Sequence, residues 1–388
     1  MRQLTNRLQG LGTTIFAEMS ALAVRTGSVN LGQGFPDTDG PESMLEDAVA
    51  AIRSGANQYP PGRGIPALRQ AIADHQKRWY DVPLDPDQQV LVTTGATEAI
   101  AAALLAYVEP GDEVIALEPY YDSYAACISM AGGHRVPVTL HAPDFRLDTD
   151  ALRAAVTDRT TVLLINSPHN PTGTVLTDDE LRAVAAIAVE HDLLVITDEV
   201  YEHLVFDGVA HRPLSTYEGM AERTVSISSA GKTFSVTGWK VGWVTGTPEV
   251  VTAVNTAKQF LTYTSGAPFQ PAVAHALALG NDYFDGIRQT LQGKRDLLCK
   301  GLTDLGFGVH IPQGTYFVTT DVRPLGYDDG IEFCRMLPEK AGVVAIPHQV
   351  FYDNVEAGKP LVRWAFCKQD DVLTEALDRL SALRPAAR

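Results

Sequence analysis

The stretch "SISSAGKTF" (residues 226–234) places a lysine directly after a strand-like run. Gly231-Lys232-Thr233 has the ending of the phosphate-binding loop G-x-x-x-x-G-K-[ST]. However, Ser226 stands where that loop needs its first glycine, and the acidic strand "LLVITDE" precedes the lysine instead of following it. Both departures disfavour a nucleotide-binding loop. The alternative is that Lys232 is a nucleophile that forms an imine.

The sequence around this stretch alternates short β-branched runs with Ala- and Leu-rich segments. The expected strands are residues 90–94, 113–119, 161–168, 193–200, 224–229 and 241–246. Helices are expected from Ala99 onward and over Asp178–Glu190. Near-continuous apolar strands that alternate with helices are typical of a mostly parallel sheet covered on both faces. The first strand runs into "GATEA" rather than G-x-G-x-x-G, which disfavours a dinucleotide-binding fold. The sequence therefore predicts an α/β fold.

The pattern changes after Pro268. A helical region (271–305) is followed by separate strand candidates in "GVHIPQGTYFVTTDV", "GVVAIP" and "LVRWAF". These segments predict a smaller α+β domain, against which the N-terminal segment is expected to pack. The predicted division is a large domain of residues 35–267 and a small domain built from residues 1–34 and 268–388.

Composition and charge indicate an ordinary globular protein. The 388 residues are 45% apolar and 20% charged, and the net charge of −16 disfavours nucleic acid or an anionic membrane as a partner. The longest apolar run, residues 99–108, is far shorter than the ~20 residues that span a bilayer. "MRQLTNRLQG" lacks the apolar region of a secretory signal, and the four cysteines have no CxxC spacing. Together these features predict reduced thiols and a cytoplasmic location.

An imine-forming lysine needs a set of partners if it is to hold pyridoxal 5′-phosphate (PLP). A carboxylate must pair with the pyridine nitrogen, a phenol and an amide must bind the ring's 3-oxygen, and an aromatic ring must cover its face. Hydroxyls, a cation and the amides of a helix N-terminus must hold the phosphate. An arginine must bind the carboxylate of an amino-acid substrate.

The sequence supplies a candidate for each role, mostly at the carboxyl ends of expected strands, where open α/β sheets bind ligands. Asp198 ends one strand, with Tyr201 shortly after it, and Asn170 follows another strand in "SPHNPTG". Arg363 lies inside the apolar run "LVRWAF", where an unpaired charge is costly. The other candidates are Gly95, Ala96, Thr97, Ser229 and Lys240 for the phosphate, and Tyr120, Tyr121 and Tyr124 for the ring.

The chain resembles class I/II, fold-type I aminotransferases over nearly its whole length. The motifs "GQGFPD", "NQY", "GATEA", "EPYYDSY", "SPHNPTG", "TDEVY", "SSAGKTF", "GWKVGW" and "VRWAF" occur in the order and spacing of that family. The resemblance implies a large PLP domain, a small domain built from both termini, and a homodimer with shared active sites. It also implies transfer of an amino group between an amino acid and a 2-oxo acid.

The resemblance assigns roles to individual residues. Lys232 forms the imine, Asp198 pairs with the pyridine nitrogen, and Tyr201 completes the catalytic set. The implied cofactor-binding residues are Gly95, Ala96, Thr97, Tyr121, Asn170, Asp198, Tyr201, Ser229, Lys232, Lys240 and, from the other subunit, Tyr59. The implied substrate-binding residues are Gly34, Asn170, Arg363 and Phe16. Many family members have arginine in place of Lys240. Here the compact ammonium of a lysine therefore replaces the planar guanidinium, which can bind a phosphate through two parallel hydrogen bonds.

Each of these residues alone also has a purely structural interpretation. Asp198 could cap a strand end, Tyr121 could simply pack, and Lys240 could be solvated. Only their joint occurrence favours the PLP site, and for Phe16 core packing and substrate contact remain equal alternatives. The ten histidines form no HExxH motif or paired cluster, so no metal site is expected.

Several passages indicate the subgroup. "NQYPPG", "EPYYDSY" and "PLGYDD…LPEKAGVVAIP" are most similar to actinobacterial N-succinyldiaminopimelate aminotransferases of lysine biosynthesis, which implies exchange with 2-oxoglutarate. That substrate carries extra carboxylates, so a second cation is expected, with Arg63 and Lys258 as candidates. The alternatives are a kynurenine, glutamine or methionine aminotransferase, or a cysteine-S-conjugate β-lyase. A PLP-binding transcription regulator is disfavoured because the aminotransferase motifs begin by Gly32.

Overall fold

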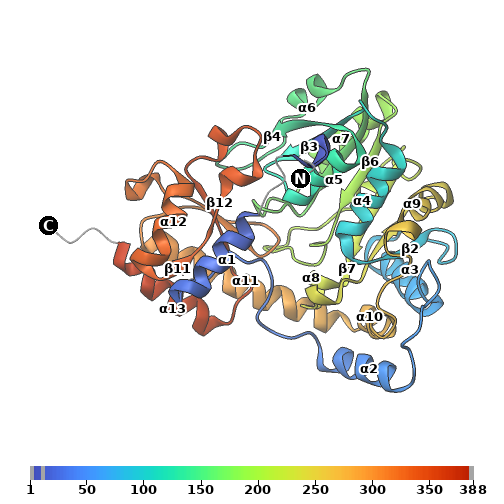
Figure 1. The fold of residues 1–388 in the computed structure, drawn as a ribbon, viewed down its shortest axis with the longest axis horizontal. Coiled ribbons are helices and arrows are strands. Elements are labelled where there is room, and N and C mark those ends of the chain that lie inside the picture. Colours follow the sequence, from blue (N-terminus) through green and yellow to red (C-terminus); the bar gives the residue numbers. More distant parts are fainter. Residues whose placement is uncertain (1–3, 10–13, 384–388) are drawn as a thin grey trace.

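A seven-stranded sheet forms the centre of the larger lobe in the computed structural model, which describes residues 4–9 and 14–383 (Figure 1). The strand order is β2-β8-β7-β6-β5-β3-β4. Only β8 runs antiparallel to its neighbours, so the mostly parallel sheet is confirmed. The strands are β2 (Val90–Thr93), β3 (Glu113–Glu118), β4 (His134–Thr139), β5 (Thr160–Asn166), β6 (Leu194–Asp198), β7 (Thr224–Ser229) and β8 (Gly242–Thr245).

Helices cover both faces of this sheet, which explains why its central strands are apolar throughout. In β3, Val114 packs with the helices of one face and Ile115 with those of the other. The first face carries α4 (Gly95–Tyr107), α5 (Asp122–Ala131) and α9 (Pro248–Leu261). The second face carries α6 (Thr149–Ala155) and α7 (Asp178–Glu190) and, toward β2 and β8, α2 (Glu42–Arg53), α3 (Pro66–Tyr80) and α10 (Phe269–Leu277).

Strand β4 was not expected from the sequence. It reads "HRVPVT" and lies at the edge of the sheet, where most of its side chains are partly or fully exposed. An edge strand need not be apolar on both faces and tolerates proline and charge. The apolar run that marks the other strands is therefore missing from β4.

The smaller lobe combines both ends of the chain, as the blue and red segments on the left of Figure 1 show. Its antiparallel sheet has the order β12-β13-β10-β9, and β1 (Val29–Asn30) pairs in parallel with β11 (Val343–Val344). The other strands are β9 (Gly308–His310), β10 (Phe317–Asp321), β12 (Ile346–Pro347) and β13 (Leu361–Ala365). The helices of this lobe are α1 (Ile15–Thr26), α12 (Gly330–Ala341) and α13 (Asp370–Leu380).

The helical region expected over residues 271–305 is two helices. The first, α10, packs against α2 and α3 of the larger lobe. The second, α11 (Asn281–Asp304), joins the lobes: its Phe284 packs in the larger lobe and its Leu302 in the smaller one. The domain division at residues 34/35 and 267/268 stays a prediction, and these contacts favour a crossing later than residue 268. Residues 1–3, 10–13 and 384–388 of the predicted small domain lie outside the described residues.

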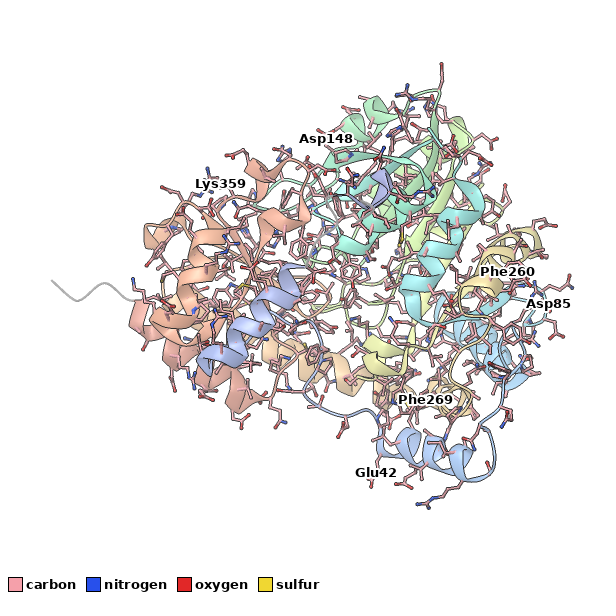
Figure 2. All side chains as sticks on the ribbon, in the orientation of Figure 1. Glu42, Asp85, Asp148, Phe260, Phe269 and Lys359 are labelled. Carbon is pink, nitrogen blue, oxygen red and sulfur yellow. The ribbon has the colours of Figure 1, made fainter. Side chains whose placement is uncertain are left out.

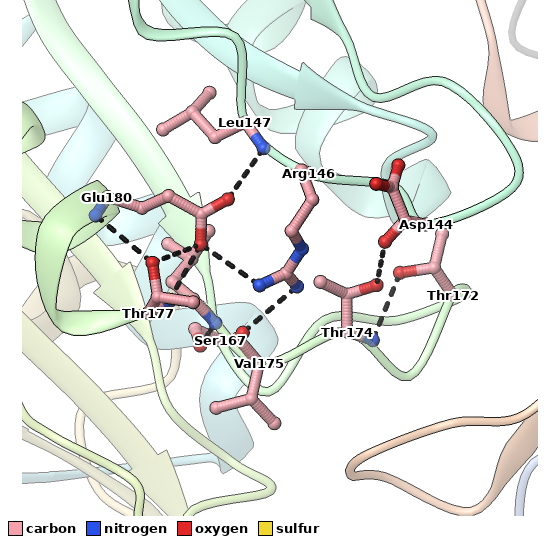
Figure 3. Close-up of polar contacts among 10 residues, drawn as sticks. Asp144, Arg146, Leu147, Ser167, Thr172, Thr174, Val175, Thr177 and Glu180 are labelled. Atoms are coloured by element: carbon pink, nitrogen blue, oxygen red, sulfur yellow. Dashed lines mark hydrogen bonds and ion pairs between the residues drawn. The ribbon is translucent and has the colours of Figure 1, made fainter.

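A capping box at the start of α7 fixes the connection from β5, which carries the "SPHNPTG" motif (Figure 3). The Glu180 amide donates to Thr177 Oγ1 at 3.2 Å, and the Thr177 amide donates to Glu180 Oε2 at 2.7 Å. The same carboxylate accepts from the Leu147 amide at 2.8 Å and from Arg146 at 3.2 Å. Such reciprocal caps satisfy donors that a helix start otherwise leaves open. The segment between β5 and α7 is therefore fixed at the point where it enters α7.

The four cysteines, Cys127, Cys299, Cys334 and Cys367, are buried and unbridged. Within the described residues, no helix is long and apolar enough to span a bilayer.

Gly242 of β8 allows the sheet to approach the start of α4 closely. A Cβ built on Gly242 would lie 2.6 Å from the Gly95 carbonyl carbon and 2.8 Å from the Ala96 nitrogen. Both are backbone atoms, so no side chain can move aside to make room. The first turn of α4 is held in place by this contact.

We expect Gly242→Ala to lower the free energy of unfolding by about 1–3 kcal/mol, because overpacking forces the backbone of α4 to shift. Urea unfolding followed by circular dichroism measures the change. Gly293→Ala is the matched control: Gly293 is a helical residue of α11 and a Cβ there meets nothing within 4 Å. That variant should gain about 0.5–1 kcal/mol. An unfolding midpoint of Gly242→Ala equal to that of the unchanged protein would contradict the expectation.

Candidate active site

A cavity of about 420 Å³ lies where the carboxyl ends of β5, β6 and β7 face the smaller lobe. Asn166, Asp198 and Ser229 end these strands and line it. The cavity brings together these predicted site residues: Phe16, Gly34, Gly95, Ala96, Thr97, Tyr121, Tyr124, Asn170, Asp198, Tyr201, Ser229, Lys232, Lys240 and Arg363. Tyr59 and Tyr120 do not line it. Phe16 both lines the cavity and packs against the core of the smaller lobe, so both of its expected roles are compatible with its position.

Asp198 is a buried carboxylate with 5% of its surface exposed. Tyr124 Oη donates to its Oδ2 at 2.6 Å, and the Val200 amide donates to its Oδ1 at 3.3 Å. Burial raises the pKa of Asp198, while these two hydrogen bonds and the Lys232 charge act to lower it. A cationic N–H group placed in the cavity would therefore find an oriented acceptor here.

Lys232 lies in the short helix α8 (Ala230–Thr233), which follows β7 directly. Its Nζ is 5.8 Å from the Tyr201 ring centroid and 5.6 Å from the Tyr316 ring centroid. Burial lowers the pKa of Lys232 to about 8, although Cys367 and Asp198 act to raise it. About half of the amine is therefore neutral near pH 8, and the neutral form is the one that attacks an aldehyde.

Arg363 lies in β13 at the opposite wall of the cavity. It donates from Nη1 to Asn170 Oδ1 and from Nη2 to the Gly32 carbonyl, both at 3.0 Å. Its guanidinium carbon is 4.0 Å from the Phe317 ring centroid. Burial lowers the pKa of Arg363 to about 10, and its Nε is a buried donor without a partner in the described chain. An incoming carboxylate would supply the missing acceptor and the missing countercharge.

The N-terminus of α4 forms an anion site beside Lys240. Gly95 has φ +74°, and a Cβ there would lie 3.1 Å from Lys240 Nζ. The ammonium is thus close to the first amides of a 13-residue helix, whose dipole also favours a negative charge. The hydroxyls of Thr97, Ser229 and Thr237 line the same cavity. These groups fit the phosphate of PLP.

Two phenols border the space between Asp198 and Lys232. Tyr121 is the N-cap of α5 and meets the Tyr124 ring edge-on, with the ring centroids 5.9 Å apart. Tyr201 packs edge-on against Tyr316 with a centroid separation of 5.3 Å. The Asn170 amide donates to Asn166 Oδ1 at 2.7 Å, which holds the loop that presents the Asn170 side chain. The donors and acceptors present match those that PLP requires.

Asp122 and Phe317 are among the cavity residues that received no role from the sequence, whereas Tyr124, a candidate for the ring, lines the cavity and donates to Asp198. Tyr124 lies three residues after Tyr121, the N-cap of α5, and this spacing brings both phenols to the same side of the helix start. Its bond to Asp198 joins segments 74 residues apart and could not be predicted.

The expected second cation is not supplied by either candidate within one chain. Arg63 donates to the Asp87 carbonyl, and Lys258 donates to the Gly62 and Tyr263 carbonyls. Neither lines the cavity, so that expectation was wrong for the single subunit.

The sequence predicted no paired histidines, but two histidines that are distant in the sequence are paired in the folded structure. His75 of α3 and His203, which follows β6, meet with their Nε2 atoms 2.7 Å apart and Glu202 beside them. Two nitrogens bound to one tetrahedral zinc at ~2.1 Å would be ~3.4 Å apart, so the distance fits a hydrogen bond instead. Burial lowers the pKa of both imidazoles, which agrees with a neutral pair.

The pKa of Lys232 predicts how the apo-protein captures PLP. The rate of capture, followed by absorbance, should rise with pH and have its midpoint at about 8, because only the neutral amine attacks. The Lys232→Ala variant is the control and should show no covalent cofactor absorbance at any pH. A midpoint near 10.5, the ordinary lysine value, would contradict the lowered pKa.

Comparison with known proteins identifies the family. The family model "Aminotransferase class I and II" matches residues 26–380. N-succinyldiaminopimelate aminotransferase from Mycobacterium tuberculosis has a solved structure with a TM-score of 0.96 and 57% identity, covering 98% of this chain and 100% of that one.

Two more distant relatives cover the chain nearly as completely. Methionine aminotransferase of Escherichia coli is 39% identical, over 97% of this chain and 98% of its own length. Kynurenine–oxoglutarate transaminase of Dictyostelium discoideum is 36% identical, over 98% of this chain and 96% of its own length. The chain belongs to the class I/II aminotransferases, and it is a PLP-dependent aminotransferase.

Proposed function

We propose that this aminotransferase acts on N-succinyldiaminopimelate with 2-oxoglutarate as the amino acceptor, in lysine biosynthesis. The observation that carries the proposal is the 57% identity, over 98% of the chain, to the mycobacterial enzyme of that name. The cavity supports the part of the reaction common to all amino acids. Recognition of the distal part of the substrate is what the proposal adds to the chemistry that all family members share.

The residues divide the common chemistry among them. When bound, PLP supplies an aldehyde carbon that receives the amino group and a protonated ring that accepts electrons. Arg363, with Asn170 beside it, binds and orients the substrate α-carboxylate. Lys232 Nζ, once free and neutral, takes the proton from the substrate Cα. Asp198 keeps a proton on the ring nitrogen, where its charge matters most as negative charge develops.

The remaining residues position the ring. Tyr201 and Asn170 would hydrogen-bond its 3-oxygen, and Tyr121 would supply the aromatic contact to the ring. The α4 amides with Thr97, Ser229 and Lys240 hold the phosphate. Gly34 leaves space at the small-lobe wall, because a Cβ there would lie 2.4 Å from Phe317 Cζ.

We infer that the functional unit of the enzyme is a homodimer. The described chain carries exposed aromatic side chains at the end of α9 and just after it, with Phe260 83% exposed (labelled in Figure 2) and Tyr263 50% exposed. Tyr59, from the loop before α3, is 82% exposed and packs against Tyr263. A contiguous exposed apolar surface marks an interaction site. Tyr59 lies outside its own cavity, which agrees with a role at the phosphate of the other subunit. The other subunit is then also the source of a cation for the distal carboxylates.

The proposed location is the cytoplasm. This follows from the biosynthetic role and from the four unbridged cysteines, which suit a reducing compartment.

The alternative substrates are kynurenine, glutamine and methionine. They are supported by the 36–39% identity to the Dictyostelium and Escherichia coli enzymes over nearly the same length. A cysteine-S-conjugate β-lyase would use the same cavity and differ only in eliminating from Cβ. The lower identity ranks both alternatives behind the diaminopimelate derivative.

Half-reactions against a panel of amino donors test the substrate. We expect N-succinyl-LL-diaminopimelate to convert the cofactor with a kcat/KM about 10²-fold above kynurenine or methionine, because a site built for polar groups rejects analogues that lack them. Glutamate should react as the reverse partner. Stopped-flow absorbance of the bound cofactor gives the rates.

The Arg363→Lys variant is the matched control for that panel. It removes the fork for the α-carboxylate, which all donors share, so it should slow every donor by a similar factor. A faster reaction with kynurenine or methionine in the unchanged protein would contradict the proposed substrate. Release of pyruvate and ammonia from a cysteine conjugate would favour the β-lyase.

A further inference from the structure

A buried lysine joins the two segments that carry the exposed aromatic surface. Lys258 lies near the end of α9 and is 0% exposed. Its Nζ donates to the Gly62 carbonyl and to the Tyr263 carbonyl, each at 2.6 Å. One ammonium thus ties residues 59–64 to residues 262–264, which lie about 200 positions apart in the chain.

Burying the Lys258 ammonium is energetically unfavourable, which indicates that its two hydrogen bonds have a structural role. Burial lowers the pKa of Lys258, with the Glu98 charge acting against it, so taking the ammonium out of water is unfavourable. An apolar side chain of similar length would fill the same space without that penalty. What the apolar side chain could not do is fix two carbonyls at one point.

Glu98 connects the same unit to the phosphate site. This α4 residue accepts from the Thr94 amide at 2.5 Å and from the Thr262 hydroxyl. Thr94 and Thr262 also share a hydrogen bond at 3.1 Å between their hydroxyls. Thr94 directly precedes Gly95, so these bonds link residue 262 to the turn that forms the anion site. The start of α4 is therefore hydrogen-bonded to Thr262 and Glu98, and the Glu98 charge acts in turn on Lys258.

Tyr59 is the residue that the joined segments present. Its ring meets the Tyr263 ring edge-on with a centroid separation of 5.5 Å, and 82% of Tyr59 is exposed. Lys258 thus holds the backbone of Tyr263 itself and the backbone three residues after Tyr59, so it contacts both segments that carry this ring pair.

We propose that Lys258 is a positioning residue for PLP binding in the neighbouring subunit. It acts through Tyr59, whose hydroxyl it places at the phosphate held by the α4 N-terminus of the second copy of this chain. The proposal rests on the homodimer and the shared phosphate site of the proposed function. Through Thr262 and Glu98, the residues around Lys258 also contact the turn that forms the phosphate site of their own subunit. The phosphate sites of the two subunits are therefore connected through these residues.

The test is a double-mutant cycle on PLP affinity, measured by titrating apo-protein and following cofactor absorbance and fluorescence. Lys258→Met and Tyr59→Phe should each raise the dissociation constant about tenfold, the value of one hydrogen bond to a charged group. The double variant should also be about tenfold weaker, not hundredfold, because both changes remove one interaction. At saturating PLP, the KM of Lys258→Met for the amino donor should stay within about twofold, since Lys258 does not line the cavity.

Hydrogen exchange supplies a readout that does not depend on the cofactor. Amides of residues 57–59 and 62–64 should exchange faster in apo Lys258→Met than in the unchanged apo-protein. Lys77→Met is the matched control: Lys77 is an exposed lysine paired with Asp81 on α3, and its loss should change neither exchange nor PLP affinity. If Lys258→Met does not fold, Thr262→Val removes the hydroxyl that bonds Glu98 and Thr94 but leaves Lys258 in place, and it should weaken PLP binding in the same direction.

The outcomes separate the inference from the function on which it rests. Unchanged PLP affinity in Tyr59→Phe would overturn both the shared phosphate site and the role of Lys258. A weaker Tyr59→Phe combined with an unchanged Lys258→Met would overturn the inference alone. Additive losses in the double variant would show that Lys258 acts by a route other than Tyr59, which also overturns it.

Discussion

The parallel pairing of β5, β6 and β7 is the constraint on which the site depends. The register sets Asn166 opposite Asp198 and Asp198 opposite Ile227, so neighbouring strands end at one edge. Buried polar groups are costly unless they are hydrogen-bonded, and here Asn166 Nδ2 donates to the Asp198 carbonyl at 2.8 Å. The position of the Asp198 carboxylate relative to Lys232 follows from that register and from the Tyr124 hydroxyl.

The smaller lobe contributes the opposite wall through one strand. Arg363 is paired with Thr319 on one side and Ile346 on the other, so its backbone is held within the small sheet. Its bond to Asn170 crosses to the larger lobe. A substrate carboxylate bound by Arg363 would therefore be held at a fixed distance from the groups that β5 and β6 present. The geometry of the reaction therefore depends on how the two sheets are held together, by this polar bridge, by helix α11 and by the packing of Tyr201 and Leu204 into the core of the smaller lobe.

The sequence predicted the features that local patterns encode. Buried strands appear as apolar runs, and polar residues just after them were correctly grouped at one edge, including Asn170, Asp198 and Ser229. Strand β4 was missed because an edge strand needs no such run. The Tyr124–Asp198 and His75–His203 contacts were missed because tertiary packing alone joins residues so far apart. Lys258 was one of two candidates for the second cation, since its charge is visible in the sequence but its burial is not.

The central claim is that Asp198 keeps the ring nitrogen of PLP protonated while Lys232 holds the opposite end. Nitrogen-15 NMR of the enzyme loaded with [¹⁵N-pyridine]PLP measures this most directly. The account predicts a protonated-nitrogen shift in the unchanged enzyme that moves to the neutral-pyridine position in Asp198→Asn, with the cofactor still bound to Lys232. A neutral-pyridine shift in the unchanged enzyme, or no difference between the two proteins, would contradict it.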